Sequence, residues 1–197
     1  DGNASFLVGN AAETTVEGFE TDWTVAVSEG LTFTGSLAFL DARYESFEDA
    51  ACNVAQITAT IASGARRSTC TQDLAGKPLQ FAPDWATNLG LDYHTSLTDN
   101  LDLGLSANIN WTDDVVIAND QDANLLQESY YKLNARAEIS DSDGQWTLAL
   151  VGKNLNDEKT SSWGNDVPLG SSGFDGTYFQ HINPPRTVEV QLRYNFL

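Results

Sequence analysis

Apolar and polar residues alternate along seven stretches of this chain. In residues 101–111, every odd-numbered position is apolar and every even-numbered position is polar or glycine. Successive side chains of a β-strand point to opposite faces, so this period of two predicts a strand with one apolar and one polar face. The seven predicted strands are 15–27, 31–45, 84–97, 101–112, 129–140, 145–155 and 186–196.

The connections between these strands alternate in length. Three are tight turns and three are longer: the turns are 28–30, 98–100 and 141–144, and the longer connections are 46–80, 113–127 and 156–185. Tight turns at one edge and long loops at the other are typical of an antiparallel β-barrel that crosses a bacterial outer membrane. Leu40 interrupts the alternation of its strand, which predicts either a bulge or the end of the lipid-facing band.

A soluble antiparallel sandwich would also alternate apolar and polar residues. The predicted strands are about 11–15 residues long, however, whereas strands of globular proteins have a mode of about five or six. The polar faces carry charged residues that suit a wet interior. Aromatic residues begin or end the apolar faces, as expected at the two membrane interfaces; they are Trp23, Trp85, Tyr93, Trp111, Tyr131, Trp146 and Tyr194.

The composition narrows the possible partners. The 197 residues include 28 acidic and 10 basic side chains, for a formal charge of −18. This charge argues against nucleic acid, which is bound through Lys and Arg. The mean hydropathy of −0.29 does not exclude a barrel, whose strands give a weak hydropathy signal. The chain begins at Asp1 and contains no Met, so we expect it to be a piece of a longer protein.

Two cysteines, Cys52 and Cys70, lie in the same long connection. Two cysteines without a nearby histidine make a poor zinc site, because structural zinc takes four ligands. A disulfide that closes an exposed loop is the favoured interpretation. It predicts an oxidising compartment such as the periplasm or the cell exterior.

Five stretches, in this order, resemble the C-terminal part of the barrel of TonB-dependent receptors of the bacterial outer membrane. They are Asn10–Glu20, Leu37–Tyr44, Leu74–Pro83, Val151–Glu158 and Pro184–Phe196. The resemblance implies the last seven strands of a 22-stranded transmembrane barrel, without the plug domain. It also implies a transporter that imports a large scarce solute, such as a ferric siderophore, cobalamin or an oligosaccharide.

The resemblance implies several partners for this chain. They are the remaining barrel strands, the plug domain, the TonB complex acting through the missing N-terminal part, and lipid with lipopolysaccharide. Tyr194 and Phe196 are expected to act as the assembly signal at the end of the closing strand. The polar residues His94, Lys132, Arg136 and Glu138 are expected to face the lumen, where either plug contact or structural pairing would use them.

Candidate ligand contacts lie in the long connections. An aromatic segment is suited either to stacking on a solute or to packing against neighbouring loops; its candidates are Trp163, Phe174, Tyr178, Phe179 and His181. Arg66 and Arg67 could attract an anionic ferric complex, but solvated loop charge is the favoured interpretation of them. Four acids could hold a loop-bound divalent cation or bridge lipopolysaccharide phosphates through such ions, but solvated charge is the favoured interpretation; they are Asp113, Asp114, Asp120 and Asp122. No resident cofactor or metal is otherwise predicted.

Two other function classes compete with transport. A secreted acidic β-sandwich that binds carbohydrate would use Trp163 and Tyr178 as a platform. A barrel that serves as an adhesin or structural pore would lack the contact with TonB. An enzyme has no positive support, because His94 and His181 are the only histidines and no G-x-S-x-G nucleophile motif occurs.

Overall fold

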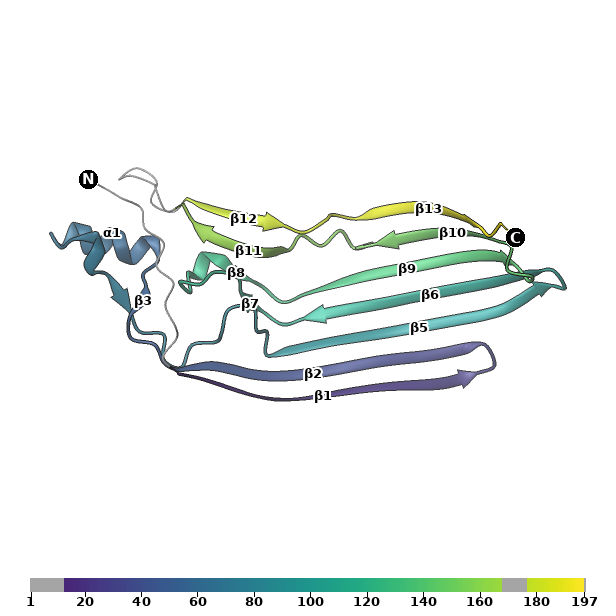
Figure 1. Ribbon diagram of the computed structural model, residues 1–197, viewed down its shortest axis with the longest axis horizontal. Coiled ribbons are helices and arrows are strands. Elements are labelled where there is room, and N and C mark those ends of the chain that lie inside the picture. Colours follow the sequence, from purple (N-terminus) through teal and green to yellow (C-terminus); the bar gives the residue numbers. More distant parts are fainter. Residues whose placement is uncertain (1–12, 168–176, 197) are drawn as a thin grey trace.

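The computed structural model describes residues 13–167 and 177–196. Seven long strands form one antiparallel sheet in chain order, so that each strand pairs with the next long strand along the sequence (Figure 1). They are β1 (Glu13–Ser28), β2 (Leu31–Ser46), β5 (Trp85–Thr98), β6 (Leu101–Thr112), β9 (Tyr130–Asp141), β10 (Trp146–Lys153) and β13 (Thr187–Tyr194). The ends of these strands lie within a residue or two of the ends predicted from the alternation.

The sheet has a turn end and a loop end. At the turn end, β1 joins β2 and β9 joins β10 through turns in which Gly30 and Gly144 have φ of 75° and 73°. These left-handed conformations favour glycine, which has no Cβ to clash with the backbone. At the loop end lie three connections, 47–84, 113–129 and 154–186, which we call the first, second and third connections.

The two faces of the sheet differ in chemistry because the register keeps residues of one kind side by side. On one face, Asp92 of β5 pairs with Ser106 of β6, which pairs in turn with Arg136 of β9. On the other face, Leu105 of β6 lies between Tyr93 and Ala137. We call the first the inner face and the second the outer face. Large apolar side chains of the outer face are exposed along most of the strands, which suits contact with lipid.

The soluble sandwich is excluded by this arrangement. A sandwich would bury its apolar side chains between two packed sheets. Here the long strands belong to one sheet, and outer-face residues such as Leu150, Val190 and Leu192 are exposed. In the described part of the chain, the cluster of buried apolar residues is small, and it lies in the second connection at Ile117, Ala118 and Leu125.

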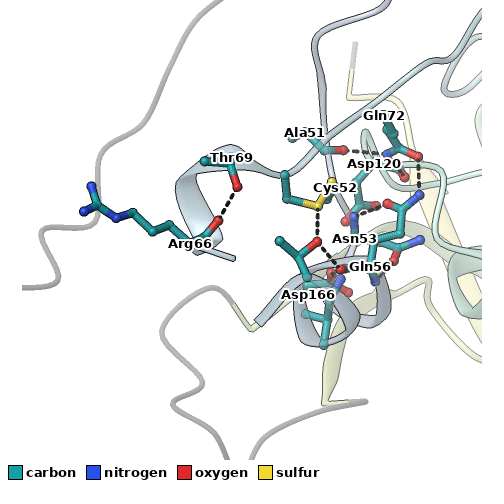
Figure 2. The surroundings of a disulfide bond; sticks show 12 residues. Ala51, Cys52, Asn53, Gln56, Arg66, Thr69, Gln72, Asp120 and Asp166 are labelled. Atoms are coloured by element: carbon teal, nitrogen blue, oxygen red, sulfur yellow. Dashed lines mark hydrogen bonds between the residues drawn. A yellow bond between two sulfur atoms is a disulfide. The ribbon is translucent and has the colours of Figure 1, made fainter. Parts of the chain in front are cut away.

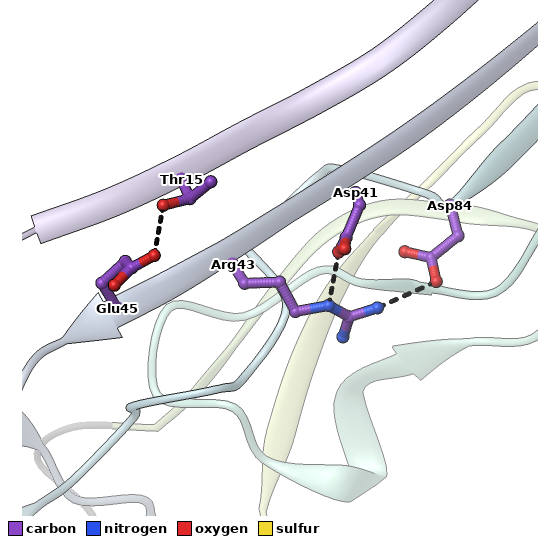
Figure 3. Close-up of polar contacts among 5 residues, drawn as sticks. All are labelled: Thr15, Asp41, Arg43, Glu45 and Asp84. Atoms are coloured by element: carbon purple, nitrogen blue, oxygen red, sulfur yellow. Dashed lines mark hydrogen bonds and ion pairs between the residues drawn. The ribbon is translucent and has the colours of Figure 1, made fainter.

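The outer face changes from aromatic to charged near the loop end. Phe19, Phe39 and Trp85 pack together across β1, β2 and β5, with ring centroids 4.7 to 5.9 Å apart. Two residues beyond Phe39, Asp41 accepts a 2.7 Å hydrogen bond from Arg43, and a second nitrogen of Arg43 lies 3.0 Å from Asp84 (Figure 3). We call Asp41, Arg43 and Asp84 the charged rim.

Leu40 lies between the aromatic cluster and the charged rim. The pairing of β1 with β2 continues across Leu40 without a shift, so the bulge predicted there is wrong. The shifts in this pairing occur instead at Glu13/Thr14 and at Ala26/Ser28. The other interpretation of Leu40, the end of the lipid-facing band, agrees with the charged residues that follow it.

The described parts of the connections at the loop end contain regular elements. The first contains β3 (Ala50–Ala51), α1 (Val54–Ala62), a 3₁₀ turn (Arg67–Thr69) and β4 (Thr71–Gln72). The second contains β7 (Val115–Val116), a 3₁₀ turn (Ala123–Leu125) and β8 (Leu126–Gln127), and the third contains β11 (Ser161–Asp166) and β12 (Tyr178–Ile182). Among the residues described, no helix is both long and apolar enough to cross a membrane.

Candidate functional site

The second and third connections pack against each other beyond the loop end of the sheet. The backbone N–H of Gly164 in β11 donates to the carbonyl oxygen of Ile117, at 3.1 Å. Tyr178 of β12 packs against the small apolar cluster of the second connection. A side chain at position 164 would collide with Leu125, whose Cδ2 lies 2.7 Å from the place of a Cβ. Glycine there permits the close approach of β11 to this cluster.

The first connection joins the same assembly. The amide side chain of Gln80 donates to the carbonyl oxygen of Ile117 at 3.0 Å, and the N–H of Phe81 donates to the carbonyl of Val116 at 3.0 Å. Further out, Gln72 donates to the backbone carbonyl of Asp120 at 2.7 Å. The three connections thus form one unit, which we call the loop assembly.

A disulfide and a capped helix order the first connection. Cys52 and Cys70 are bonded and lie 18 residues apart in the sequence (Figure 2). Immediately after Cys52, Asn53 accepts a hydrogen bond from the backbone of Gln56, whose side chain in turn accepts one from the backbone of Asn53. This capping box satisfies two N–H groups that the first turn of α1 would otherwise leave unpaired.

Three aspartates are buried where the connections meet. Asp120, Asp122 and Asp166 are 4%, 3% and 6% exposed. Asp166 accepts a 2.6 Å hydrogen bond from the N–H of Val54, the first residue of α1, and so links β11 to the first connection (Figure 2). One carboxylate oxygen of Asp122 and one of Asp166 are buried without a hydrogen-bond partner. Unpaired buried charge of this kind is costly, which makes this cluster electrostatically unusual.

The environment changes the acidity of Asp166 and Tyr178. Burial, with the nearby charge of Asp120 as the next contribution, raises the pKa of the Asp166 carboxyl from 3.8 to about 6. Burial and the charges of Asp122 and Asp166 raise the pKa of the Tyr178 hydroxyl, which accepts a 2.8 Å hydrogen bond from Asn124. Both shifts favour the neutral form of the group.

The predicted aromatic contacts are divided between two environments. Trp163 and Phe179 lie edge to face with centroids 5.0 Å apart, and they are 41% and 42% exposed. His181 pairs with Trp163 in the β11–β12 hairpin, and its Nδ1 lies 3.1 Å from the hydroxyl of Ser162. Tyr178 instead packs inward against the second connection. Phe174 lies outside the described residues. Trp163 and Phe179 therefore form an exposed aromatic pair on the β11–β12 hairpin.

The predicted arginines lie at the exposed tip of the first connection. Arg66 precedes the short 3₁₀ turn, and its carbonyl accepts a 2.7 Å hydrogen bond from the hydroxyl of Thr69. Its side chain points away from the disulfide (Figure 2). Arg67, also exposed, is the first residue of that turn. Both positive charges thus belong to a segment closed by the disulfide.

The predicted lumen residues lie on the inner face but do not form one group. Glu138 of β9 lies 2.7 Å from Arg136, which also donates to Gln191 of β13 at 2.9 Å. His94 of β5 and Glu138 lie on either side of Gly104, near the turn end. Lys132, near the loop end, donates to the buried hydroxyl of Thr160 at 2.8 Å. Lys132 is therefore a support of the third connection.

The remaining predicted residues are the two aromatic residues of the assembly signal and the four acids considered for a cation. The rings of Tyr194 and Phe196 pack edge to face with centroids 4.9 Å apart at the turn end of β13, where Tyr194 pairs with Trp146. Asp113 and Asp114 line a small cleft with Arg43 and Asp84, apart from the buried aspartates. The four acids considered for a cation are therefore divided between two places. In the described ranges, no group of three acidic, histidine or cysteine side chains is arranged to hold a metal ion.

Sequence reasoning did not identify Asp166, Val54 or Gln72 as parts of the loop assembly. The start of α1 had a local signal, because Asn53 followed three residues later by Gln56 is the pattern of a capping box. Asp166 had no local signal. Its hydrogen bond to Val54 joins residues that are 112 positions apart.

The comparisons with known proteins agree with the antiparallel barrel wall. Residues 1–155 match the family model described as "TonB dependent receptor-like, beta-barrel". No curated protein matches the sequence. The fold is similar to that of the ferric yersiniabactin uptake receptor FyuA from Yersinia pestis, with a TM-score of 0.67 and 13% identity over 93% of this chain and 24% of that one.

Two solved structures from Acinetobacter baumannii are also similar. The siderophore receptor PiuA has a TM-score of 0.61 and 16% identity over 91% of this chain and 21% of that one. The ferric preacinetobactin receptor BauA has a TM-score of 0.60 and 16% identity over 93% of this chain and 22% of that one. The chain thus spans less than a quarter of the length of each of these receptors.

Proposed function

Because the chain belongs to the TonB-dependent receptor β-barrel family, we propose that it forms part of the wall and external loops of a transporter that imports a ferric siderophore. The chain is part of an outer-membrane β-barrel, and its relatives in structure are receptors rather than enzymes. The remaining strands, a plug domain and the TonB complex are the partners that such a transporter requires.

The observation that carries this proposal is the difference between the two faces of one sheet. The outer face is apolar and ends in an aromatic cluster and a charged rim, whereas the inner face carries residues such as Asp92 and Arg136. A wall of this kind separates lipid from a wet passage. The family match supports the further step from a passage to energised import.

The siderophore class is supported by the similar solved structures and by the loop assembly. The structures named above are receptors for siderophores. Trp163 and Phe179 offer aromatic surface at the loop end, and Arg66 offers positive charge on an otherwise acidic chain. Aromatic surface and positive charge are two features that suit an anionic iron complex whose ligands carry aromatic rings.

Uptake of iron-55 tests the proposal. The gene that encodes this chain is deleted, and cells under iron limitation receive a panel of catecholate, hydroxamate and mixed ferric siderophores. We expect the deletion to abolish uptake of one class, and removal of TonB to have the same effect. Undiminished uptake of the whole panel, together with lost uptake of cobalamin or an oligosaccharide, would replace the siderophore with that solute.

Variants of the β11–β12 hairpin test the contact residues. We expect Trp163→Ala and Phe179→Ala each to raise the Kd of the ferric complex about tenfold, which corresponds to a loss of about 1.4 kcal/mol. Ile182→Ala is the matched control, because Ile182 is exposed on the same hairpin but has no aromatic ring. Equal Kd values for the three variants would remove the hairpin from the binding site.

A further inference from the structure

The three connections of the loop assembly meet at two carboxyl groups. Asp166 comes from the third connection and Asp120 from the second, and Gln72 of the first donates to the backbone of Asp120. Asp166 also accepts a hydrogen bond from Val54 at the start of α1. Any change in the charge of Asp166 therefore acts on all three connections at once.

Two ionised carboxylates would not be stable in this arrangement. Asp120 and Asp166 are both more than nine-tenths buried, and the nearby charge of Asp120 favours the protonated form of Asp166. Asp166 has one oxygen bonded to Val54 and one buried oxygen without a donor. Asp122 adds a third buried carboxyl with an unpaired oxygen. A proton on the free oxygen of Asp166 would donate to Asp120, supplying the missing hydrogen bond and removing one negative charge.

We propose that one proton shared between Asp120 and Asp166 holds the three connections of the loop assembly together, and that its loss loosens them. We call this pair the proton latch. It goes beyond the proposed transport function, because it concerns the closure of the loops and not the identity of the solute.

The other groups around Asp166 define the direction of the effect. Asp120 and Asp122 from the second connection favour the protonated form, as does burial, whereas the N–H of Val54 favours the ionised form. Tyr178 of β12 is neutral near neutral pH, because the ordinary pKa of a tyrosine hydroxyl is already 10 and burial raises it further. Asn53 and Gln56, which cap the neighbouring helix, are uncharged. The balance of these groups favours a proton on the pair.

The pH window follows from linkage. In the assembled loops the pKa of Asp166 is about 6, whereas a solvated Asp166 in opened loops has the ordinary value of 3.8. The stabilisation is therefore complete below about pH 4 and is lost as pH rises toward about 6. Within this window, the equilibrium constant for closure falls about tenfold for each pH unit, and above about pH 6 it falls little further. Between pH 4.5 and 7.5 the constant therefore falls about thirtyfold.

Hydrogen exchange of the intact protein in detergent tests the latch. Peptides that contain Val54, Ile117 and Gly164 report opening of the assembly, because the N–H of each donates across or within it. After correction for intrinsic exchange rates, we expect their protection to fall about thirtyfold between pH 4.5 and 7.5. Peptides of β5 and β6 in the sheet should keep their protection. Protection of the loop peptides that is constant across this range would overturn the proposal.

Two substitutions sharpen the experiment. Asp166→Asn keeps the acceptor for Val54 and places a permanent N–H donor toward Asp120, so it should hold the loops closed at both pH values. Asp114→Asn is the matched control, because Asp114 is exposed and lies in the separate cleft near Arg43; it should keep the pH dependence of the wild type.

A cation in place of the proton would give a different result. In that case calcium at pH 7.5 would restore protection in the wild type, a chelator would reverse it, and Asp166→Asn would lose protection. This pattern would overturn the proton latch. The wild-type profile alone decides the question if the variant does not fold.

Discussion

At the scale of single residues, glycines of the sheet make room for particular neighbours. The ring of Trp23 in β1 lies over Gly35 of β2, and a Cβ at position 35 would come 2.2 Å from a ring carbon. On the inner face, Gly104 lies between Glu138 and His94 in the same way. Alternation alone identifies the face of each residue. It does not reveal these contacts, because they depend on which strands are neighbours and in what register.

Gly35→Ala tests the contact with Trp23. The added methyl forces the ring out of its place, and overpacking of this kind typically costs about 1–3 kcal/mol. We expect a lower urea midpoint for loss of the folded, heat-modifiable band of the detergent-purified protein. Ser36→Ala, on the opposite face of the same strand, is the control. An unchanged midpoint for Gly35→Ala would mean that the ring moves aside without loss.

At the scale of elements, the connections are the parts that carry independent structure. The first connection has its own helix and disulfide, the second has a small apolar cluster, and the third has a hairpin. Lys132 and Thr160 fasten the third connection to the end of β9. The long strands therefore supply a rigid base, and under the proposed function the connections supply the surface that an external solute would meet.

Loss of the disulfide tests the stability of the first connection. Substitution of both Cys52 and Cys70 by serine removes a cross-link across 18 residues, for which the chain-entropy model gives about 3 kcal/mol. We expect trypsin to cut after Arg66 and Arg67 at least tenfold faster, as followed by mass spectrometry over time. Cleavage after Lys153, in the sheet, serves as the internal control. If the variant and the wild type were cleaved after Arg66 and Arg67 at the same rates, the first connection would be held by contacts other than the disulfide.

The helix cap can be tested separately. Asn53→Ala removes the acceptor for the N–H of Gln56, and loss of such a cap typically costs about 1 kcal/mol. We expect the amides of α1 to exchange about five times faster. Ile61→Ala, near the other end of the helix, leaves the cap intact and should not accelerate exchange. A result in which both variants behave alike would contradict a specific role for the cap.

The sequence predicted the sheet well and the connections poorly, for one physical reason. Successive side chains of a strand in a barrel wall face lipid and water in turn, so the strand from Leu101 to Trp111 could be assigned from its alternation alone. The meeting of Asp166 with Val54 and Asp120 depends on segments that are far apart in the chain. The disulfide between Cys52 and Cys70 was expected because both cysteines lie in one connection. Alanine-rich α1 was assigned to a loop, although Asn53 and Gln56 carried the signal for its start.

At the scale of the whole molecule, the seven-stranded sheet has two free edges. In the described part of the chain, β1 and β13 each pair on one side only. Backbone N–H and C=O groups without partners are costly in lipid, so such edges must pair with further strands. The sheet is therefore a segment of a larger wall, as its coverage of less than a quarter of the solved receptors also indicates.

The free edges lead to a prediction about residues 1–197 produced alone. We expect this chain to require detergent and to show rapid amide exchange in β1 and β13, with slower exchange in the central strands β5 and β6. The intact protein is the comparison, and in it β1 and β13 should be as protected as the centre. A stable monomer in water without detergent would contradict the barrel wall.

The step from aromatic to charged residues on the outer face has a consequence for immersion depth. Phe39 and Arg43 are separated by four residues of a tilted strand, a vertical distance on the order of 10 Å. If the barrel sank into the bilayer by that distance, Arg43 would enter the hydrocarbon, which costs about 2–4 kcal/mol at the midplane and less near the interface. If the barrel rose by the same distance, the ring of Trp85 would be exposed to water. The bilayer thus fixes the elevation of the loops above the cell surface, and any opening toward a solute must come from rearrangement among the loops themselves.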